Sequence, residues 1–403
     1  MTLGTKHHQI VIIGGGAAGI DVGARLRHAG LKDVAIVEPS DTHWYQPLWT
    51  LVGGGCVSLD KTRRPESRVM PKGVTWVKDA AVAIDPDAQS VSLASGTTIE
   101  YDALVVCPGI QLNWDGIGGL SDALGHDGVS SNYLGEMAPK TWEFIRNLKS
   151  GTAVFTMPAG PIKCAGAPQK IAYLAADYWR QQGVLKDIKV VLALPGAAMF
   201  GVPEFSRVLD DVVKRYGIEV RFQRELAEVH GSAHEVVLVD KSGDESQKEV
   251  LGYDFLHAVP PQSAPDWLRA SPLADAASPF GYVEVDKNTH QHVRHANVFS
   301  LGDAGSTPNS KTAAAIRKQA PVVVANLRAA MKNQALPKSY DGYSSCPLTT
   351  ARNRMLLAEF DYTMKPHPTF PVINTQKERY DMWLLKRYGL PFMYWHLMVK
   401  GRA

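Results

Sequence analysis

The sequence predicts an α/β fold with two Rossmann-like dinucleotide-binding domains, the second inserted into the first, followed by a C-terminal region of different character. Three observations predict this fold. The chain opens with an apolar strand, a glycine turn, a helix and another strand. Apolar strands that close on glycine return near residues 101 and 297, and a second alternation of strands and helices lies between them. Such alternation favours parallel sheets covered by helices. We expect residues 1–114 and 253–334 to form the first domain, 115–252 the second, and 335–403 the C-terminal region.

The composition is that of an ordinary globular protein. Hydrophobic residues make up 45% of the 403 residues and charged residues 21%, which excludes a disordered chain, a collagen and a coiled coil. The formal net charge of +3, without a basic tract, argues against a nucleic-acid partner. No apolar stretch reaches the roughly 18–20 residues of a spanning helix. Only about ten residues precede the first strand, so we expect no signal peptide.

The first strand, Gln9–Ile13, runs into the turn Gly14-Gly15-Gly16-Ala17-Ala18-Gly19. A helix, Ile20–His28, and a strand, Val34–Val37, follow, and the strand ends at Glu38. Gly14 permits the tight turn, Gly16 lets backbone approach a pyrophosphate, and Gly19 lets the helix pack on the sheet, while an acid at this distance suits a ribose. The pattern predicts a dinucleotide site. The alternative is a plain turn with a surface Glu38.

Two later segments return to this domain. Tyr101–Ile110 and Asn297–Asp303 are apolar strands that close on Gly109 and Gly302, and the helix Ala313–Ala330 follows the second of them. Asp303 stands at a strand end, where ligands of open α/β sheets bind.

The inserted domain has the same rhythm of strands and helices. Its elements are expected at Ala153–Met157, Ala167–Gln182, Ile188–Leu194, Glu204–Tyr216 and Val220–Gln223. The turn after its first strand, Pro158–Pro168, has no GxGxxG, and its second strand ends at Leu194-Pro195 without an acid. A second pyrophosphate and ribose lack their usual partners there, which argues against a nicotinamide dinucleotide.

The four cysteines lie too far apart for a zinc site or a CxxC pair. Cys164 follows Lys163 in the loop before a helix that Pro168 opens, and a helix N-terminus favours a thiolate. Cys346 precedes Pro347 in what we expect to be an extended loop, 182 positions further on. Taken alone, each of the two could be a small buried hydrophobe. For Cys56 and Cys107 we prefer that interpretation.

Four segments together closely resemble the sulfide:quinone oxidoreductases, and among them the two-cysteine type that includes the mitochondrial enzyme. These segments are His43–Gly55, Gly160–Lys170, Tyr340–Leu348 and Leu357–Tyr362. The resemblance implies FAD in the first domain, hydrogen sulfide as substrate and a Cys164/Cys346 redox pair. It implies that two electrons pass through FAD to ubiquinone or another quinone, while a persulfide sulfur goes to a small sulfane-sulfur acceptor.

The resemblance also implies contacts residue by residue. The FAD contacts carried over are Gly14, Gly16, Gly19, Glu38, Gln46, Ala81, Gly109, Gly302, Asp303, Lys311, Thr312, Ala313 and Ile316. The backbone near Ala81, in an expected strand Val74–Val82, would meet the adenine, and Lys311 would stabilise negative charge on reduced flavin. Their alternatives are a turn residue for Gln46 and a surface lysine at a helix start for Lys311. The quinone contacts carried over are Phe360, Phe392 and Tyr394, with core packing as the alternative. No metal is expected, because no histidines and carboxylates stand at ligand spacing.

The segment Lys377–Ala403 holds six Lys/Arg and two acids among several aromatics. Aromatic and apolar side chains beside cations suit the headgroup boundary of an anionic membrane. We therefore expect a membrane-facing C-terminal region in a peripheral or monotopic protein of the bacterial inner membrane. The alternative is a helix packed on the protein's own core or on a second copy in a homodimer.

Two rival functions stay open from the sequence. One is the flavoprotein subunit of a sulfide dehydrogenase with a cytochrome acceptor, and the other is a non-catalytic FAD-bound disulfide redox sensor. The sequence does not name the sulfane-sulfur acceptor, the quinone, the oligomeric state or the membrane face.

Overall fold

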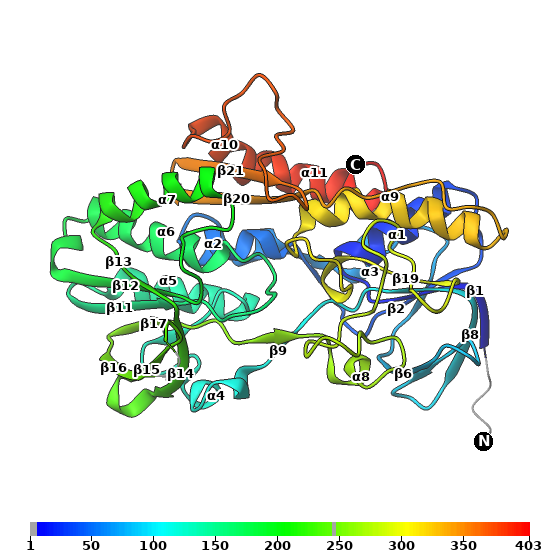
Figure 1. The fold of residues 1–403 in the computed structure, drawn as a ribbon, viewed down its shortest axis with the longest axis horizontal. Helices are drawn as coiled ribbons and strands as arrows, with labels where there is room; N and C mark the ends of the chain where they lie inside the picture. Colours follow the sequence, from blue (N-terminus) through cyan, green and yellow to red (C-terminus); the bar gives the residue numbers. More distant parts are fainter. Residues whose placement is uncertain (1–5, 244–246) are drawn as a thin grey trace.

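The structure is a computed structural model that describes residues 6–243 and 247–403. Two α/β domains stand side by side, and the C-terminal region lies across both on one side of the molecule (Figure 1). The expected fold class, with two Rossmann-like domains, is confirmed.

The first domain is built on a seven-stranded sheet. Its strands in spatial order are β5 (Thr75–Val77), β2 (Val34–Val37), β1 (Lys6–Ile13), β8 (Thr98–Val106), β7 (Ser90–Leu93) and β6 (Ala81–Asp85), and β19 (Val298–Ser300) also pairs with β8. The central strand β1 pairs in parallel with β2 and β8, so that Ile12 is opposite Ile36 and Val105. All three residues are buried, as expected for parallel strands covered on both faces. Helices α1 (Ala17–His28) and α9 (Ala313–Ala330) pack against each other beside this sheet.

The expected strand Val74–Val82 is wrong. The chain instead forms β5 and, after a turn at Asp79, the separate strand β6, which pairs in antiparallel fashion with β7. Asp79 stabilises the turn because its carboxylate accepts a hydrogen bond from the Ala80 backbone N–H at 2.7 Å. Ala81 begins β6 and is buried in the core of the sheet.

The second domain has a five-stranded parallel sheet with a small antiparallel sheet below it in Figure 1. The large sheet runs β10 (Val129–Ser130), β17 (Phe255–His257), β11 (Gly151–Thr156), β12 (Ile188–Leu194) and β13 (Glu219–Phe222). Its helices are α5 (Ala138–Asn147), α6 (Ala167–Gln181) and α7 (Pro203–Tyr216). The small sheet has β14 (Arg224–His230), β15 (Glu235–Asp240) and β16 (Gln247–Gly252). Because β17 pairs with β11, the expected domain boundary at residue 252 falls just before a strand of this sheet.

The C-terminal region begins with a hairpin of β20 (Ser344–Ala351) and β21 (Arg354–Phe360) that packs on α6. Four short helical segments follow, namely α10 (Tyr380–Leu384), the π-helix η8 (Leu385–Gly389), α11 (Leu390–His396) and the 3-10 helix η9 (Met398–Lys400). Cys346 therefore lies within a strand, opposite Ala358, and its expected place in a loop is wrong. A two-stranded hairpin tolerates Pro347 because both strands are edge strands, where an N–H is not always needed for a hydrogen bond to a neighbouring strand. Within the described residues, no helix is long and apolar enough to cross a bilayer.

Several short strands and α-helices lie outside the two large sheets. They are β3 (Thr42–Trp44), β4 (Arg63–Pro65), α2 (Trp49–Gly53), α3 (Glu66–Val69), α4 (Leu120–Ala123), α8 (Asp266–Arg269), β9 (Gln111–Leu112) and β18 (Gln262–Ser263).

Candidate active site

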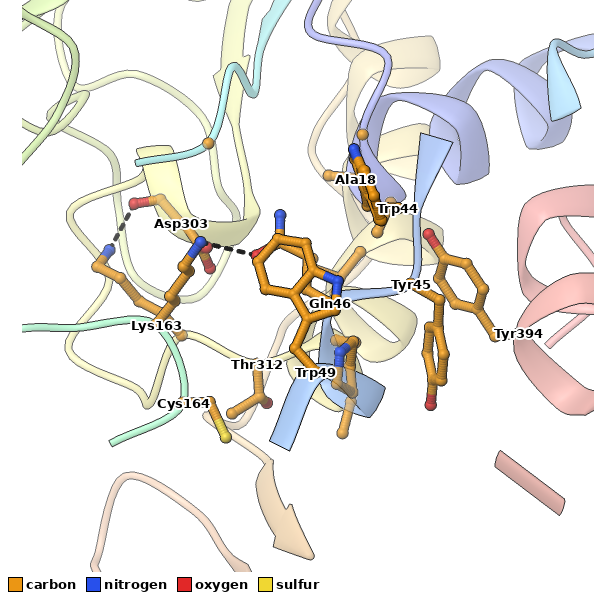
Figure 2. A pocket seen from close by; sticks show the side chains of 18 of the residues that line it. Ala18, Trp44, Tyr45, Gln46, Trp49, Lys163, Cys164, Asp303, Thr312 and Tyr394 are labelled. Carbon is orange, nitrogen blue, oxygen red and sulfur yellow. Dashed lines mark hydrogen bonds between the residues drawn. The ribbon is translucent and has the colours of Figure 1, made fainter. Parts of the chain in front are cut away.

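A cavity of about 370 Å³ lies where the two domains meet the C-terminal region. Its wall contains the glycine turn, the segment after β3, the loop before α6, the start of α9, the β20 strand and α11. The expected site residues on this wall are Gly16, Glu38, Gln46, Gly109, Cys164, Asp303, Lys311, Thr312, Ala313, Ile316 and Tyr394. Figure 2 shows how the side chains of Cys164, Thr312, Asp303 and Gln46 gather around the same space.

The glycine turn is shaped to admit a ligand. Gly14 has φ +102°, and a Cβ there would lie 2.4 Å from the Cys107 carbonyl oxygen, so only glycine fits. A Cβ on Gly19 would lie 1.9 Å from the Gly14 oxygen, which makes Gly19 the packing glycine between helix and strand. Gly16 has open space within 4 Å of its Cβ position and faces the cavity at the N-terminus of α1. A pyrophosphate therefore has both room and the positive end of a helix dipole.

Glu38, directly after β2, faces the same cavity. One carboxylate oxygen accepts a hydrogen bond from the Gly15 N–H and the other from the Ser40 N–H, each at 2.7 Å. Burial raises the pKa of Glu38. The carboxylate keeps free lone pairs beside the open space at Gly16, and its alternative as a plain surface residue does not hold. The glycine turn and this acid fit the adenosine diphosphate half of FAD.

The opposite wall comes from the end of β19 and the start of α9. The Lys311 ammonium donates hydrogen bonds to the backbone oxygens of Asp303 at 2.7 Å and Gly305 at 3.0 Å, and burial lowers its pKa to about 8. Lys311 is only 5% exposed, so its alternative as a surface lysine is wrong. Thr312 caps α9 by accepting from the Ala315 N–H, which directs the N-terminus of this helix at the cavity.

Other expected cofactor residues have different surroundings. Gln46 lines the cavity, and its side-chain oxygen accepts a hydrogen bond from Lys163 at 2.8 Å (Figure 2). Gly302, with φ +69°, donates its N–H to Gln319 behind the wall. Ala81 belongs to the core of the sheet and does not line the cavity, and the expected backbone contact with adenine near it stays a prediction.

Cys164 is held by its backbone in the loop between β11 and α6. It has φ +50°, its N–H donates to the Lys311 oxygen at 2.9 Å, and its own oxygen accepts from the Ala167 N–H at 2.7 Å. The Tyr133 hydroxyl donates to the same oxygen at 3.2 Å. This left-handed conformation is uncommon for a residue other than glycine, and such positions cluster at functional sites. The side chain is thereby presented to the cavity.

Cys164 and Cys346 form a hydrogen-bonded pair of opposite acidity. The pKa of the Cys164 thiol is held well below its usual range, first by the hydrogen bond from Cys346 and then by Lys170, whose ammonium lies 3.0 Å from the Cys164 sulfur. The same hydrogen bond, together with burial, raises the pKa of Cys346. Burial also raises the pKa values of Cys56 and Cys107. Cys164 is therefore the thiolate of the pair, and both are free thiols in this structure.

Two lysines at this site were missed from the sequence. Lys170 lies in the first turn of α6, and Lys386 in the π-helix η8 is 1% exposed, donates to the Pro47 oxygen at 2.8 Å and has a pKa lowered by burial to about 7. The sequence does contain a signal for Lys170. A cation in the first turn of a helix is unfavourable next to the positive end of the helix dipole, so an anionic partner is expected nearby. No spacing rule links Lys386 to Cys164.

The three expected quinone residues do not come together. Phe360 is buried in the core, with its ring 5.7 Å from that of Phe200. Phe392 is 61% exposed on the outer face of α11. Only Tyr394 lines the cavity, where the nitrogen Nε2 of His43 is 2.6 Å from its hydroxyl. Core packing, the alternative interpretation, describes Phe360.

Metal chemistry receives no support from the described residues, which hold no cluster of three or more potential ligands. The site instead combines a dinucleotide cradle with a thiol pair. These features fit an FAD-dependent oxidoreductase, and this is the class to which the chain belongs.

Comparison with known proteins narrows the class. Residues 8–320 match the family described as Pyridine nucleotide-disulphide oxidoreductase. The mitochondrial sulfide:quinone oxidoreductase of Dictyostelium discoideum is 44% identical over 98% of this chain and 86% of its own length. The mitochondrial enzyme of Mus musculus is 42% identical over 98% of this chain and 87% of its own. The chain belongs to the sulfide:quinone oxidoreductase family.

A solved structure agrees with this fold. The sulfide:quinone oxidoreductase from Aquifex aeolicus superposes with a TM-score of 0.81 at 18% identity, covering 98% of this chain and 92% of that one. At this identity the likeness concerns the fold alone.

Proposed function

We propose that the chain oxidises hydrogen sulfide at the Cys164/Cys346 pair and passes two electrons to a quinone. In the oxidised enzyme the two sulfurs are joined. Hydrosulfide attacks the Cys346 sulfur, a new S–S bond forms there, and the Cys164–Cys346 bond breaks with its electron pair going to Cys164. The products are a persulfide on Cys346 and a thiolate on Cys164. The observation that carries this proposal is geometric: the Lys170 ammonium lies 3.0 Å from the Cys164 sulfur and can stabilise a thiolate there.

The direction of attack follows from the lowered pKa of the Cys164 thiol. In thiol–disulfide exchange the sulfur with the lower pKa leaves faster. Lys170, 3.0 Å from the Cys164 sulfur, stabilises the charge that develops on the leaving thiolate. Hydrosulfide is therefore directed to Cys346, which keeps the new sulfur atom until an acceptor removes it. That acceptor is a small nucleophile, such as sulfide, sulfite or a thiol.

FAD, when bound, would supply the two-electron redox chemistry that connects the Cys164 thiolate to the quinone. Gly16 and Glu38 would hold its adenosine diphosphate half, and the start of α9 lines the same cavity as Cys164 and the glycine turn. The buried ammonium of Lys311 can stabilise negative charge at this wall.

The quinone approaches from the C-terminal side. The wall there is apolar, with Leu390, Met393 and Met398 facing the cavity. On the outer surface of the same region, Tyr380, Tyr388 and Phe392 are each about 60% exposed, which would suit the boundary of a bilayer. We infer that this region rests on a membrane surface and admits a lipid-soluble quinone.

Anaerobic stopped-flow reduction of the holoenzyme by sulfide tests the proposal. Cys164→Ser and Cys346→Ser should abolish bleaching of the flavin absorbance, because neither can form the S–S link. Cys56→Ser, which removes a thiol that packs beside Gly54, is the matched control and should react at the wild-type rate. Normal bleaching in either of the first two variants would overturn the proposed cycle.

A further inference from the structure

A buried chain of three polar side chains crosses the cavity wall away from the cysteines. His43 in β3 stands between Glu66 at the start of α3 and Tyr394 in α11. The His43 nitrogen Nδ1 lies 3.2 Å from a Glu66 carboxylate oxygen, and Nε2 lies 2.6 Å from the Tyr394 hydroxyl. All three residues are at most 2% exposed, and all three line the cavity. Figure 2 shows the Tyr394 ring on the other side of the view from Cys164.

The hydrogen-bond partners fix where protons sit. Nδ1 of His43 faces two acceptors, the Glu66 carboxylate and the Gly15 carbonyl oxygen at 3.1 Å, so Nδ1 carries a hydrogen. Nε2 faces a hydroxyl, which can either donate to it or accept from it. A second proton on Nε2 would make an imidazolium, and the Glu66 carboxylate supplies the buried counter-charge that such a cation needs.

Glu66 has a further feature that a purely structural ion pair lacks. Its second oxygen, Oε1, is buried and has no hydrogen-bond partner among the described residues. A buried acceptor without a partner is costly. Glu66 therefore keeps one acceptor oxygen unused beside His43.

Tyr394 connects this pair to the apolar wall. It extends from the helix that also supplies Leu390 and Met393 to the wall and exposes Phe392 on the outside. Burial holds the pKa of Tyr394 above its usual range. The hydroxyl can therefore give up its proton only when a second proton reaches it at the same time. Tyr394 lines the same cavity as these apolar side chains.

We propose that His43 and Glu66 form a proton store that supplies, through Tyr394, one of the two protons consumed when quinone becomes quinol. This inference rests on the proposed function. The Tyr394 O–H bond breaks as an O–H bond forms on the quinone oxygen, and the N–H bond at Nε2 of His43 breaks as Tyr394 regains its hydrogen. The two electrons come from the cofactor, and the second proton accompanies them or comes from water. Tyr394 is the catalytic residue, while His43 and Glu66 act through it.

The test separates reoxidation by quinone from reoxidation by an acceptor that takes up no proton. Holoenzyme is reduced with dithionite and mixed in a stopped-flow instrument with a short-chain ubiquinone or with ferricyanide. Tyr394→Phe and His43→Gln should slow reoxidation by quinone on the order of 10²-fold, the usual contribution of a general acid, and leave the ferricyanide rate within twofold. Glu66→Gln, which keeps the shape, should give a smaller loss of the same kind. Tyr101→Phe, which alters a buried tyrosine outside this cavity, is the control.

Each outcome of this experiment either supports or overturns the proposed proton store. Equal slowing with both acceptors would show a structural role and overturn the proposal, as would wild-type reoxidation by quinone in Tyr394→Phe. If His43→Gln does not retain its flavin, the rates of reoxidation by quinone and by ferricyanide are compared in Glu66→Gln instead. Restoration of the quinone rate in His43→Ala by added imidazole would support a proton role, because imidazole replaces the ring and not the packing. Because dithionite bypasses the cysteines, failure of sulfide to reduce the flavin would count against the proposed function alone.

Discussion

Replacing Lys170 with methionine should raise the pKa of Cys164. The ammonium donates to the thiolate sulfur at 3.0 Å, and a hydrogen bond to a charged group contributes about 1.5–3 kcal/mol. At about 1.4 kcal/mol per pKa unit, the pKa should rise by roughly 1–2 units. The hydrogen bond from Cys346 remains, so the pKa of Cys164 should stay below that of Cys346. Methionine preserves the length of the buried side chain, which limits repacking.

Alkylation provides the assay. Reduced holoenzyme is treated with iodoacetamide across a pH series, and mass spectrometry of the Cys164 peptide gives the rate at each pH, because only the thiolate reacts. The midpoint of this profile should move upward in Lys170→Met, and sulfide should bleach the flavin more slowly because the leaving thiolate is less stable. Lys214→Met, on the exposed side of α7, should leave the profile unchanged. A midpoint equal to that of wild type in a folded Lys170→Met protein would refute the assignment of Lys170 as the partner of the thiolate.

Three further perturbations address the cofactor, the membrane and acid stability. Gly16→Val should leave the fold intact, because its Cβ has open space, yet give protein without flavin absorbance, whereas Gly196→Ala at another open site should retain FAD. The double change of Tyr388 and Phe392 to glutamate should weaken co-sedimentation with anionic vesicles at least tenfold, since burying an aromatic side chain contributes about 1.5–3 kcal/mol, and flavin reduction by sulfide should be unaffected. Burial lowers the pKa of His257 from its usual value to about 3, so its contribution to stability is complete above pH 6.5 and is lost as the pH falls towards 3. Urea unfolding at pH 7 and pH 5 should therefore show a smaller acid loss in His257→Gln than in wild type, by about 2 kcal/mol, and equal losses would contradict this account.

The fold was predictable where the local sequence pattern agrees with the tertiary structure. The strand Val34–Val37 and the helix Ala313–Ala330 have the expected bounds, because apolar runs and glycine turns mark buried parallel strands and their helices. The failures have a common cause. Val74–Val82 was expected to be one strand, but the turn at Asp79 divides it between two edges of the sheet. The hairpin around Cys346 depends on its pairing with β21, which a proline in the sequence conceals.

The candidate site was predictable in its parts that have fixed spacing and not in those that meet only by folding. The glycines and Glu38 lie within one βαβ unit, so their spacing carries the signal. Lys386, His43 and Glu66 reach the cavity from three separate segments, and no periodicity relates them. Tyr394 and Phe392 are neighbours in sequence with opposite fates, because helix α11 turns one inward and the other outward.

The cavity draws its walls from nearly the whole length of the chain, from the glycine turn at the start to α11 near residue 396. During synthesis on the ribosome, the first domain cannot complete its sheet until β19 emerges, and the thiol pair cannot form until the β20 strand has followed. A nascent chain of three hundred residues therefore already carries Cys164 but neither its partner thiol nor the π-helix that closes the wall. The complete thiol pair and the closed cavity wall are thus acquired only in the last stage of translation.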